Sequence, residues 1–335
     1  MTKRITALLL AELMLLNLCA CGESSGETRT ETQTETHEEA QAEEKTAEEP
    51  AVPLSPMEQL VLDAETGDAG AMSALGDMYY YGDGVEADIE TARSWYEKAG
   101  DAGNSIAYLL LGNSYYYPDD EWKDYGKAFE YYSKAAEAGV ADAMGNMGVM
   151  YASGYGVEQD YEKAIECYEK AGDAGCAWAL RNIGLIYLYG RKGIEKDFDK
   201  AEEYFLKAAE NGNSNSMARL GELYFGQGGM AMYDLNKAIE WFTKSAEAEE
   251  PDPYGMFQLA QRYQYGQGVD RDYEKAFELY NRALEIWKAQ NSPDVFYPLT
   301  VKTIGEMYEN GLGVEKDPEK AAEYYKWAEE LNNKG

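Results

Sequence analysis

Apolar and small residues recur along this chain with helical spacing, in paired segments. Two stripes between residues 136 and 175 share the spacing i, i+3, i+4, i+7: Met144, Met147, Gly148 and Tyr151, and then Ala164, Cys167, Tyr168 and Ala171. Such spacing places side chains on one face of a helix. The intervening GYGVEQD contains glycines that permit a tight turn, and Asp160 is placed to cap the second helix. We therefore predict two helices joined by a turn.

This unit recurs along the chain. Taking Gly148 as the ruler residue, the equivalents follow at steps of 36, 36, 36, 37, 39 and 45 residues: Gly76, Gly112, Gly148, Gly184, Gly221, Ala260 and Gly305. A tyrosine stands three residues after each: Tyr79, Tyr115, Tyr151, Tyr187, Tyr224, Tyr263 and Tyr308. An aspartate precedes each second helix: Asp88, Asp124, Asp160, Asp197, Asp234, Asp272 and Asp317. Seven helix pairs are predicted.

Each second helix repeats a small residue and an aromatic four residues apart. The aromatics are Tyr96, Tyr132, Tyr168, Phe205, Phe242, Tyr280 and Tyr325. A single helix pair cannot bury its own apolar face, whereas stacked pairs form a continuous core. We expect the small residues to allow close helix approach, and both sets of aromatics to be core residues. Each buried aromatic then contributes about 1.5–3 kcal/mol.

The motifs LGxMY, GxGV and D-x-x-KA-x-x-x-Y resemble those of the Sel-one-like repeat (SLR) family, a relative of the tetratricopeptide repeats. The resemblance runs from Gly67 to Asn333. It implies an all-α fold, a right-handed α/α superhelical solenoid of about seven repeats. It also implies a protein-binding scaffold without catalysis, so we expect no enzyme activity, cofactor or metal.

Three departures interrupt the pattern. The second copy has YPDDEWKD in place of GxGV, and the fifth has GQGGMAMYD. Between the sixth and seventh copies, near residues 288–300, lies the insertion NSPDVFYPL. We expect this insertion to offset the last pair and to act as a hinge or kink.

The first twenty residues have the pattern of a targeting segment. Lys3 and Arg4 precede the apolar stretch from Ile5 to Leu18, which is too short for a comfortable membrane span. Leu18-Cys19-Ala20-Cys21-Gly22 resembles the bacterial lipobox, which implies cleavage after residue 20 and lipidation, for instance by palmitate, at Cys21. Because Glu12 interrupts the apolar stretch, an ordinary secretion signal or a short uncleaved anchor stays an alternative. This resemblance implies a location at the bacterial cell membrane, on its extracytoplasmic face.

Residues 21–54 are rich in Glu and Thr and contain no aromatic residue. Such a segment cannot bury enough surface to fold, so we predict a disordered acidic tether. Ser55, Pro56 and Glu58 form a helix-start signature, and residues 55–66 are predicted to be a capping helix. The solenoid would then occupy 67–335.

Charge limits the possible partners. The chain carries 62 acidic and 30 basic residues, for a net charge of −32; loss of residues 1–20 removes Lys3, Arg4 and Glu12 and leaves 61 against 28, or −33. This charge opposes nucleic-acid binding and favours a basic partner. We expect a monomer that is held at the membrane through its lipid and that binds an envelope or extracellular protein.

Candidate chemistry is sparse. The one histidine, His37, lies in the predicted tether, and the chain has no S-x-x-K, CxxC, HExxH or GxGxxG. A histidine-based acid, base or nucleophile pair is therefore excluded. Cys167 aligns with aromatic positions, so we expect it to be buried. Cys176 aligns with helix-capping positions, so we expect it to be exposed and the two cysteines to stay unpaired.

A binding surface is instead predicted on the first helices. Residues three before, one after and five after the ruler vary between copies, whereas core positions do not. Copies one, two, four and six place here Ser73, Asp77 and Tyr81; Leu109, Asn113 and Tyr117; Arg181, Leu185 and Tyr189; Phe257, Gln261 and Tyr265. We select as candidate partner contacts Asp77, Tyr81, Asn113, Tyr117, Arg181, Tyr189, Gln261 and Tyr265. These positions could equally face solvent or pack on the next pair.

The leading hypothesis is a lipid-anchored extracytoplasmic scaffold that binds a protein in its concave groove. An alternative is binding of cell-wall carbohydrate or peptidoglycan, with aromatic side chains as stacking platforms. A third is β-lactam binding or hydrolysis, because some secreted SLR members are associated with it; those members have cysteine pairs in each repeat, and this chain does not.

Overall fold

The structure is a computed structural model that describes residues 54–117, 122–292 and 294–333. The predicted signal peptide, Cys21 and the tether up to residue 53 lie outside the described residues. The chain divides into two units, Met1–Leu60 and Val61–Gly335. All the helix pairs lie in the second unit.

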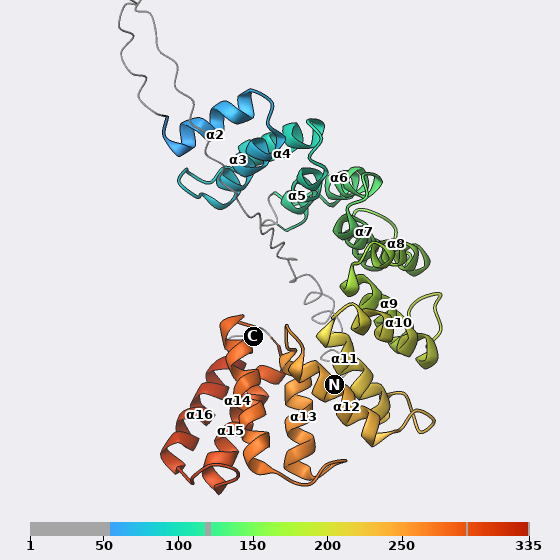
Figure 1. The fold of residues 1–335 in the computed structure, drawn as a ribbon, viewed down its shortest axis with the longest axis vertical. Helices are drawn as coiled ribbons and strands as arrows, with labels where there is room; N and C mark the ends of the chain where they lie inside the picture. Colours follow the sequence, from blue (N-terminus) through green and yellow to red (C-terminus); the bar gives the residue numbers. More distant parts are fainter. Residues whose placement is uncertain (1–53, 118–121, 293, 334–335) are drawn as a thin grey trace, which may run out of the picture. The chain divides into compact units, whose positions relative to one another are not determined.

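The described residues form fifteen α-helices, drawn in Figure 1. They are α2 (Pro56–Glu65), α3 (Ala69–Tyr81), α4 (Ile89–Asp101), α5 (Ser105–Tyr116), α6 (Tyr125–Glu137), α7 (Ala141–Ser153), α8 (Tyr161–Asp173), α9 (Ala177–Tyr189), α10 (Phe198–Glu210), α11 (Ser214–Glu222), α12 (Leu235–Glu247), α13 (Pro253–Tyr265), α14 (Tyr273–Ala289), α15 (Phe296–Asn310) and α16 (Pro318–Asn332). Within these ranges no residue lies in a β-strand, although Arg191 and Ile194 form an isolated bridge. The predicted all-α class is confirmed.

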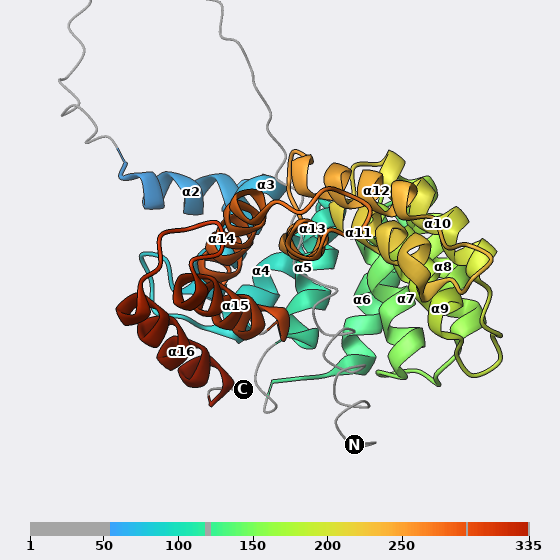
Figure 2. The same ribbon diagram turned by 90° about the horizontal axis from the view of Figure 1, so that it is seen from below.

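The helices pack as seven antiparallel pairs, which we number as repeats 1 to 7 from α3–α4 to α15–α16. Within the second unit, each second helix also contacts the first helix of the next repeat. Figures 1 and 2 show the pairs following one another in chain order. The predicted solenoid of seven helix pairs is therefore confirmed.

An aspartate caps every second helix, as the sequence predicts. In α8, Asp160 Oδ1 accepts hydrogen bonds from the backbone N–H groups of Glu162 and Lys163, both at 3.0 Å. The same arrangement fixes the loop, because the Asp160 N–H donates to the carbonyl of Tyr151 at 2.9 Å. The equivalent aspartate-to-tyrosine bond is present in all seven repeats, at 2.8–3.0 Å.

The ruler glycines let the second-helix aromatics lie flat against the first helix. A Cβ added at Gly148 would lie 2.6 Å from the ring of Tyr168, and one at Gly76 would lie 2.5 Å from the ring of Tyr96. Real Cβ atoms do not approach this closely, so these positions require glycine. Six of the seven aromatics are buried, which confirms their predicted core role, whereas Tyr325 of repeat 7 is half-buried; the buried six are Tyr96, Tyr132, Tyr168, Phe205, Phe242 and Tyr280.

The hydroxyl of the second-helix aromatic has a different partner in the last two repeats than in the first two. In repeats 1 and 2 the aromatic's hydroxyl reaches the residue directly after the ruler. In repeat 6 the Tyr280 hydroxyl instead donates to Gln264, one turn beyond Ala260, at 2.7 Å. Repeat 7 has the same arrangement as repeat 6, since the Tyr325 hydroxyl donates to Glu309, four residues after Gly305, at 2.7 Å.

The GxGV loops also join neighbouring repeats. Gly156 has φ = +70°, and a Cβ there would lie 2.5 Å from the carbonyl oxygen of Tyr125 at the start of α6. A Cβ at Gly313 would lie 2.0 Å from the corresponding oxygen of Tyr273. The second glycine of the motif therefore allows both the turn and the backbone contact with the preceding repeat.

The tyrosines three residues after the ruler need a correction, because only Tyr224 is buried and the other six are half-buried. In repeats 2 to 7 the lysine of the D-x-x-KA motif lies over the ring. The Lys–Tyr pairs are 127–115, 163–151, 200–187, 237–224, 275–263 and 320–308, with Nζ 4.4–5.5 Å from the ring centroid. A ring at the edge of the core therefore carries a cation–π contact on its outer side.

The insertion between repeats 6 and 7 is packed, which argues against the predicted hinge. Trp287 and Tyr297 are 1% and 6% exposed and belong to the core. The ring of Phe296 lies 4.6 Å from that of Tyr254 and 5.2 Å from that of Phe257. These contacts hold the insertion against α13.

In repeat 5, α11 continues into a π-helical turn, Leu223–Gln227, and Met230 beyond it is 88% exposed.

Neither Cys167 nor Cys176 forms a disulfide, but their environments differ from the prediction. Cys176 is the residue before α9, as expected of a capping position, yet it is buried at 7% exposure. Its thiol lies 3.7 Å from Asp142 Oδ1, which also accepts from the Trp178 indole N–H at 3.2 Å. Cys167 is only half-buried. The predicted exposures of both residues are therefore wrong.

The start of α2 has the predicted capping box. The Ser55 N–H donates to Glu58 Oε2 at 2.8 Å, and the Glu58 N–H donates to the Ser55 hydroxyl at 3.3 Å.

Among the described helices, none combines the length and the apolar character that crossing a membrane requires.

Candidate partner-binding surface

The candidate stripe on the first helices carries exposed tyrosines at its C-terminal end. Tyr81, Tyr117 and Tyr265 are 75%, 47% and 56% exposed, and Tyr189 is half-buried. Each is the last residue of its first helix or follows it directly. Because the first helices end at equivalent points, the repeat geometry presents one residue at this point in each repeat, and it is a tyrosine in repeats 1, 2, 4 and 6. Large aromatic side chains of this kind are frequent anchors in protein interfaces.

The position directly after the ruler has a second role. In repeat 1, Asp77 Oδ1 accepts a hydrogen bond from the Tyr96 hydroxyl at 2.6 Å. In repeat 2, Asn113 Oδ1 accepts from Tyr132 at 2.8 Å. Burial and the hydrogen bond to Asp77 raise the pKa of Tyr96 well above its usual value. Asp77 and Asn113 are therefore held in fixed orientations by the core aromatics beneath them.

The remaining stripe positions are more enclosed. Arg181 and Leu185 are half-buried, and Gln261 Oε1 accepts from Arg262 Nη2 at 3.2 Å. Ser73 and Phe257 are buried, so these two positions do not face a partner. Phe257 is covered because Phe296 from the insertion packs over it. The position three before the ruler is therefore closed in repeats 1 and 6, while the tyrosine five after the ruler stays exposed in both.

The comparison of sequence copies does not reveal a polar cluster that lies on α11 and α13. Arg219 Nη1 and Glu222 Oε2 form an ion pair at 3.0 Å, with side chains only 14% and 17% exposed. The Tyr254 hydroxyl donates to Glu222 and accepts from Gln258 Nε2. Arg219 and Gln258 both stand two residues before the ruler, a position that the comparison of copies leaves out. Polar residues at this position in two consecutive copies, repeats 5 and 6, are the sequence feature from which the cluster could be predicted.

The N-terminal repeats concentrate aromatic surface. The rings of Tyr80 and Tyr81 meet edge to face at 5.0 Å, and those of Tyr116 and Tyr117 do so at 4.8 Å. Tyrosine hydroxyls are protonated at neutral pH, so that of the exposed Tyr117 can donate a hydrogen bond. Trp122, between α5 and α6, is 39% exposed. This surface offers both flat rings and hydroxyl donors.

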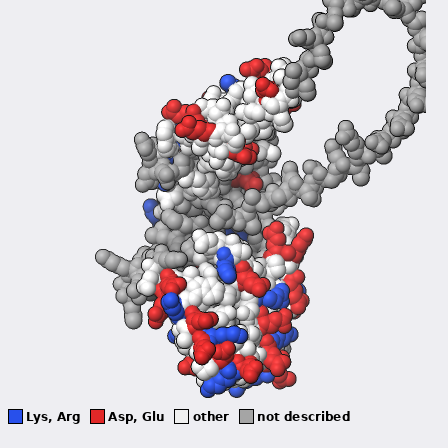
Figure 3. Space-filling view, turned by 90° about the vertical axis from the view of Figure 1, so that its left-hand side faces the viewer, with Lys and Arg blue, Asp and Glu red and all other residues white. Residues whose placement is uncertain are grey.

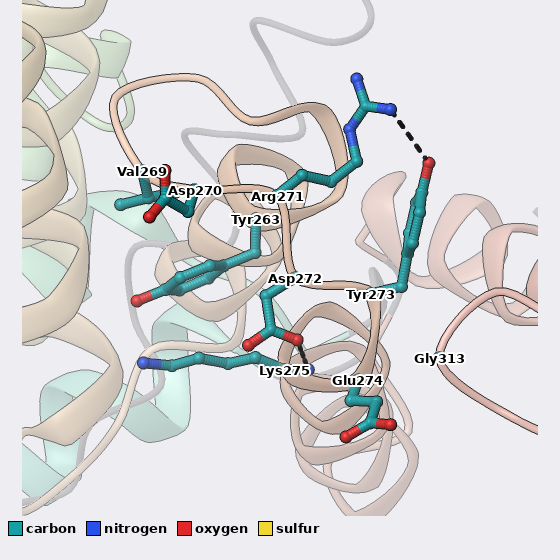
Figure 4. Close-up of a pocket in the computed structure, with 9 residues that line it drawn as sticks. All are labelled: Tyr263, Val269, Asp270, Arg271, Asp272, Tyr273, Glu274, Lys275 and Gly313. Atoms are coloured by element: carbon teal, nitrogen blue, oxygen red, sulfur yellow. Dashed lines mark hydrogen bonds between the residues drawn. The ribbon is translucent and has the colours of Figure 1, made fainter.

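An open cavity of about 690 Å³ lies where the loop before α14 meets Gly313 (Figure 4). Its polar groups largely engage one another. Lys275 Nζ lies 4.4 Å from the centroid of Tyr263, and Asp272 caps α14 through the Lys275 N–H at 3.0 Å. Arg271 points toward the Tyr273 hydroxyl, 3.5 Å away (Figure 4). The cavity therefore lies at the junction between repeats 6 and 7, and its polar groups mostly interact with one another.

In the part of the chain that the structure describes, no three His, Cys, Asp or Glu side chains group so as to hold a metal ion. The capping aspartates accept backbone hydrogen bonds, and several tyrosine hydroxyls, such as those of Tyr96, Tyr132 and Tyr280, donate to neighbouring side chains. What this geometry offers chemically is a surface of rings, amides and carboxylates for non-covalent binding.

Stacked helix pairs with a variable stripe on the first helices define an α-helical repeat protein of the scaffold class. The chain belongs to the Sel1 repeat family, whose repeat matches residues 69–104, 105–140, 141–176, 179–213, 214–249, 253–285 and 304–333. Sel1 repeats typically mediate protein–protein interactions and are generally non-enzymatic, and the related tetratricopeptide-like proteins also bind protein partners.

Two solved structures support this assignment. The antigen c5321, described as protective and present in uropathogenic Escherichia coli, displays an SLR fold; it is 31% identical, with a TM-score of 0.65 over 84% of this chain. This chain spans 57% of the length of that antigen. A Sel1 repeat protein from Oxalobacter formigenes is 26% identical, with a TM-score of 0.68 over 83% of this chain and 77% of its own. No curated protein matches this chain in sequence.

Proposed function

We propose that the chain is a lipid-anchored extracytoplasmic scaffold that binds an envelope or extracellular protein through the stripe on its first helices. The observation that carries the proposal is the series of exposed tyrosines at equivalent ends of the first helices, Tyr81, Tyr117 and Tyr265, together with the half-buried Tyr189. The scaffold acts as an adaptor and catalyses no reaction.

The anchor and the location rest on the N-terminal sequence. The basic start, the short apolar stretch and the lipobox-like Leu18–Gly22 support lipidation at Cys21. With a net charge of −33 after cleavage, the chain would be repelled by anionic lipid, and stable attachment needs a covalent lipid. Cys21→Ser should release the protein from the membrane fraction and abolish labelling by a fatty-acid analogue. Retention of the variant in membranes would contradict the anchor.

Capture of partners tests the binding surface. The tagged full chain is crosslinked in its native cells and purified, and partners are quantified by mass spectrometry. We expect the double variant Tyr117→Ala, Tyr189→Ala to lose the captured partner. The matched control is Tyr233→Ala, because Tyr233 is also 47% exposed but lies in the loop before α12. Undiminished capture by the double variant would remove the stripe as the binding surface.

Binding of cell-wall carbohydrate is the second candidate, favoured by the exposed rings of Tyr81, Tyr117 and Trp122, on which sugar rings can stack. Sedimentation of the full chain with purified cell wall separates the two candidates. Retention in the pellet that is lost in Tyr117→Ala would favour the glycan, whereas a soluble protein that still captures its protein partner would favour the scaffold.

A further inference from the structure

A lysine and a tyrosine form the same contact in six of the seven repeats. The lysine three residues after the capping aspartate places its Nζ over the tyrosine three residues after the ruler, at 4.4–5.5 Å from the ring centroid. In repeats 3 and 7 this lysine also pairs with the capping aspartate, at 3.7 Å for Lys163–Asp160 and 3.8 Å for Lys320–Asp317. Ring and aspartate together form a binding position for a cation, which we call the cation seat.

Repeat 1 has the ring and the aspartate of the cation seat but not the lysine. Its tyrosine is Tyr79 and its aspartate is Asp88, and the residue at the lysine position is Thr91. The Asp88 N–H donates to the Tyr79 carbonyl at 2.8 Å, as in the other repeats, so the two groups are held in the same arrangement. Asp88 Oδ2 accepts from the Thr91 hydroxyl at 2.6 Å. Among the described residues, no cation lies over the half-buried ring of Tyr79.

The surroundings of this seat are strongly acidic. Residues 54–104 contain eleven Asp and Glu and two basic residues, Arg93 and Lys98, which gives a net charge of −9. Both basic side chains are engaged elsewhere: Arg93 lies 3.7 Å from the centroid of Tyr115 and donates to the Trp122 carbonyl at 2.8 Å, and Lys98 lies 4.2 Å from the centroid of Trp95. In Figure 3 the N-terminal repeats show acidic groups with few basic ones, whereas the C-terminal repeats mix both.

We propose that repeat 1 binds a lysine- or arginine-rich segment of a partner protein, with one cationic side chain over the Tyr79 ring beside Asp88. The excess negative charge of the repeat attracts the rest of the segment. Six repeats of the same chain fill the equivalent seat with their own lysine, so the chemistry that this seat accepts is an ammonium or guanidinium group. This inference rests on the proposed scaffold function and specifies the chemistry of its partner.

Filling the seat from within the chain tests the proposal. The probe is a fluorescent peptide of alternating lysine and serine, and its affinity for the full chain is measured by anisotropy at low and physiological salt. Thr91→Lys should place a lysine over Tyr79 and weaken binding about five-fold, which is the size of one cation–π contact. The same peptide with acetylated lysines should not bind.

Two controls separate the seat from general electrostatics. Thr91→Gln has a comparable side chain without charge and should bind like the unmodified chain. Asn236→Lys adds the same charge at an exposed position of α12 and should leave binding within two-fold. Equal weakening by Asn236→Lys and Thr91→Lys, unchanged binding in Thr91→Lys, or no binding of the unacetylated peptide would each overturn the proposal. Capture of a partner through Tyr117 and Tyr189 would survive any of these results, so the two proposals fail separately.

Discussion

Replacing a ruler glycine by alanine tests the packing that holds each repeat together. On an isolated helix, alanine is favoured over glycine by about 1 kcal/mol. In this fold a Cβ at Gly148 would lie 2.6 Å from Cδ1 and Cε1 of Tyr168. Tyr168 is 1% exposed and cannot swing into solvent. The steric conflict and the helix preference therefore oppose each other, and the sign of the effect shows which is larger.

The structure sets the expected magnitude. Overpacking a close-packed core costs about 1–3 kcal/mol, and a Cβ placed 2.6 Å from a buried ring belongs at the upper end of that range, about 2–3 kcal/mol. The gain in helix preference offsets about 1 kcal/mol of that. Gly148→Ala should therefore destabilise the protein by about 1–2 kcal/mol. Gly305→Ala should cost less, because a Cβ there would lie 3.0 Å from the nearest ring atom of Tyr325, and that tyrosine is only half-buried.

Urea unfolding of the full chain, followed by far-UV circular dichroism, measures these changes. Gly126→Ala is the matched control, since Gly126 is helical and exposed and its added Cβ would meet only Asp124 Oδ1, at 3.4 Å; it should be neutral or slightly stabilising. If Gly148→Ala were as stable as the unmodified chain, or if it shifted the midpoint like Gly126→Ala, the close glycine–aromatic contact would not be what fixes the pair.

Three further changes probe the caps, the core and a buried carboxyl group. Asp160→Ala removes the acceptor of two N–H groups at the start of α8 and should lower the free energy of unfolding by about 1 kcal/mol; recovery in Asp160→Asn, measured by thermal melting, would be expected, and no loss in Asp160→Ala would contradict the cap. Tyr132→Ala empties a fully buried position and should cost about 3–5 kcal/mol, so a folded variant with an unchanged urea midpoint would contradict the core assignment. Burial raises the pKa of Asp252 despite the nearby Arg219, so the folded chain holds this proton to higher pH than the unfolded chain, and stability from this group falls as pH rises through that window. Asp252→Asn keeps an oxygen for the Gly255 N–H and should gain stability relative to the unmodified chain at pH 7 but not at pH 3.5; urea midpoints at both pH values check this, and an equal shift at both would argue against the raised pKa.

Much of the fold can be predicted because the helix pair occurs seven times in the sequence, so its capping and packing positions can be identified by comparing the copies. Asp160 and its equivalents are recognisable as caps from their spacing alone, and the glycine opposite Tyr168 is recognisable because the ruler position precedes the aromatic by 20 or 21 residues in every copy. Helical periodicity identifies the face of a helix that points to the core. It does not show how far a neighbouring helix covers that face, which is why the half-burial of Tyr151 beneath Lys163 cannot be predicted from it.

The remaining errors lie where copies cease to be equivalent. The repeat pattern places Phe257 on the open stripe, but the insertion occurs once, so no comparison of copies can show that Phe296 covers it. Cys176 does stand at a helix start, yet alignment with polar caps hides its packing against Asp142. The polar cluster of Arg219 and Glu222 involves contacts between repeats, and a pattern within one repeat cannot reveal them.

The central claim is that the first helices carry the partner-binding surface. Site-specific photocrosslinking tests it most directly, with p-benzoylphenylalanine replacing Tyr117, Tyr189 or Tyr233, one at a time, in the full chain within its native cells. The account predicts crosslinks to the same partner protein from positions 117 and 189 and none from position 233. Crosslinks from position 233 alone, with positions 117 and 189 silent in a folded protein, would contradict it.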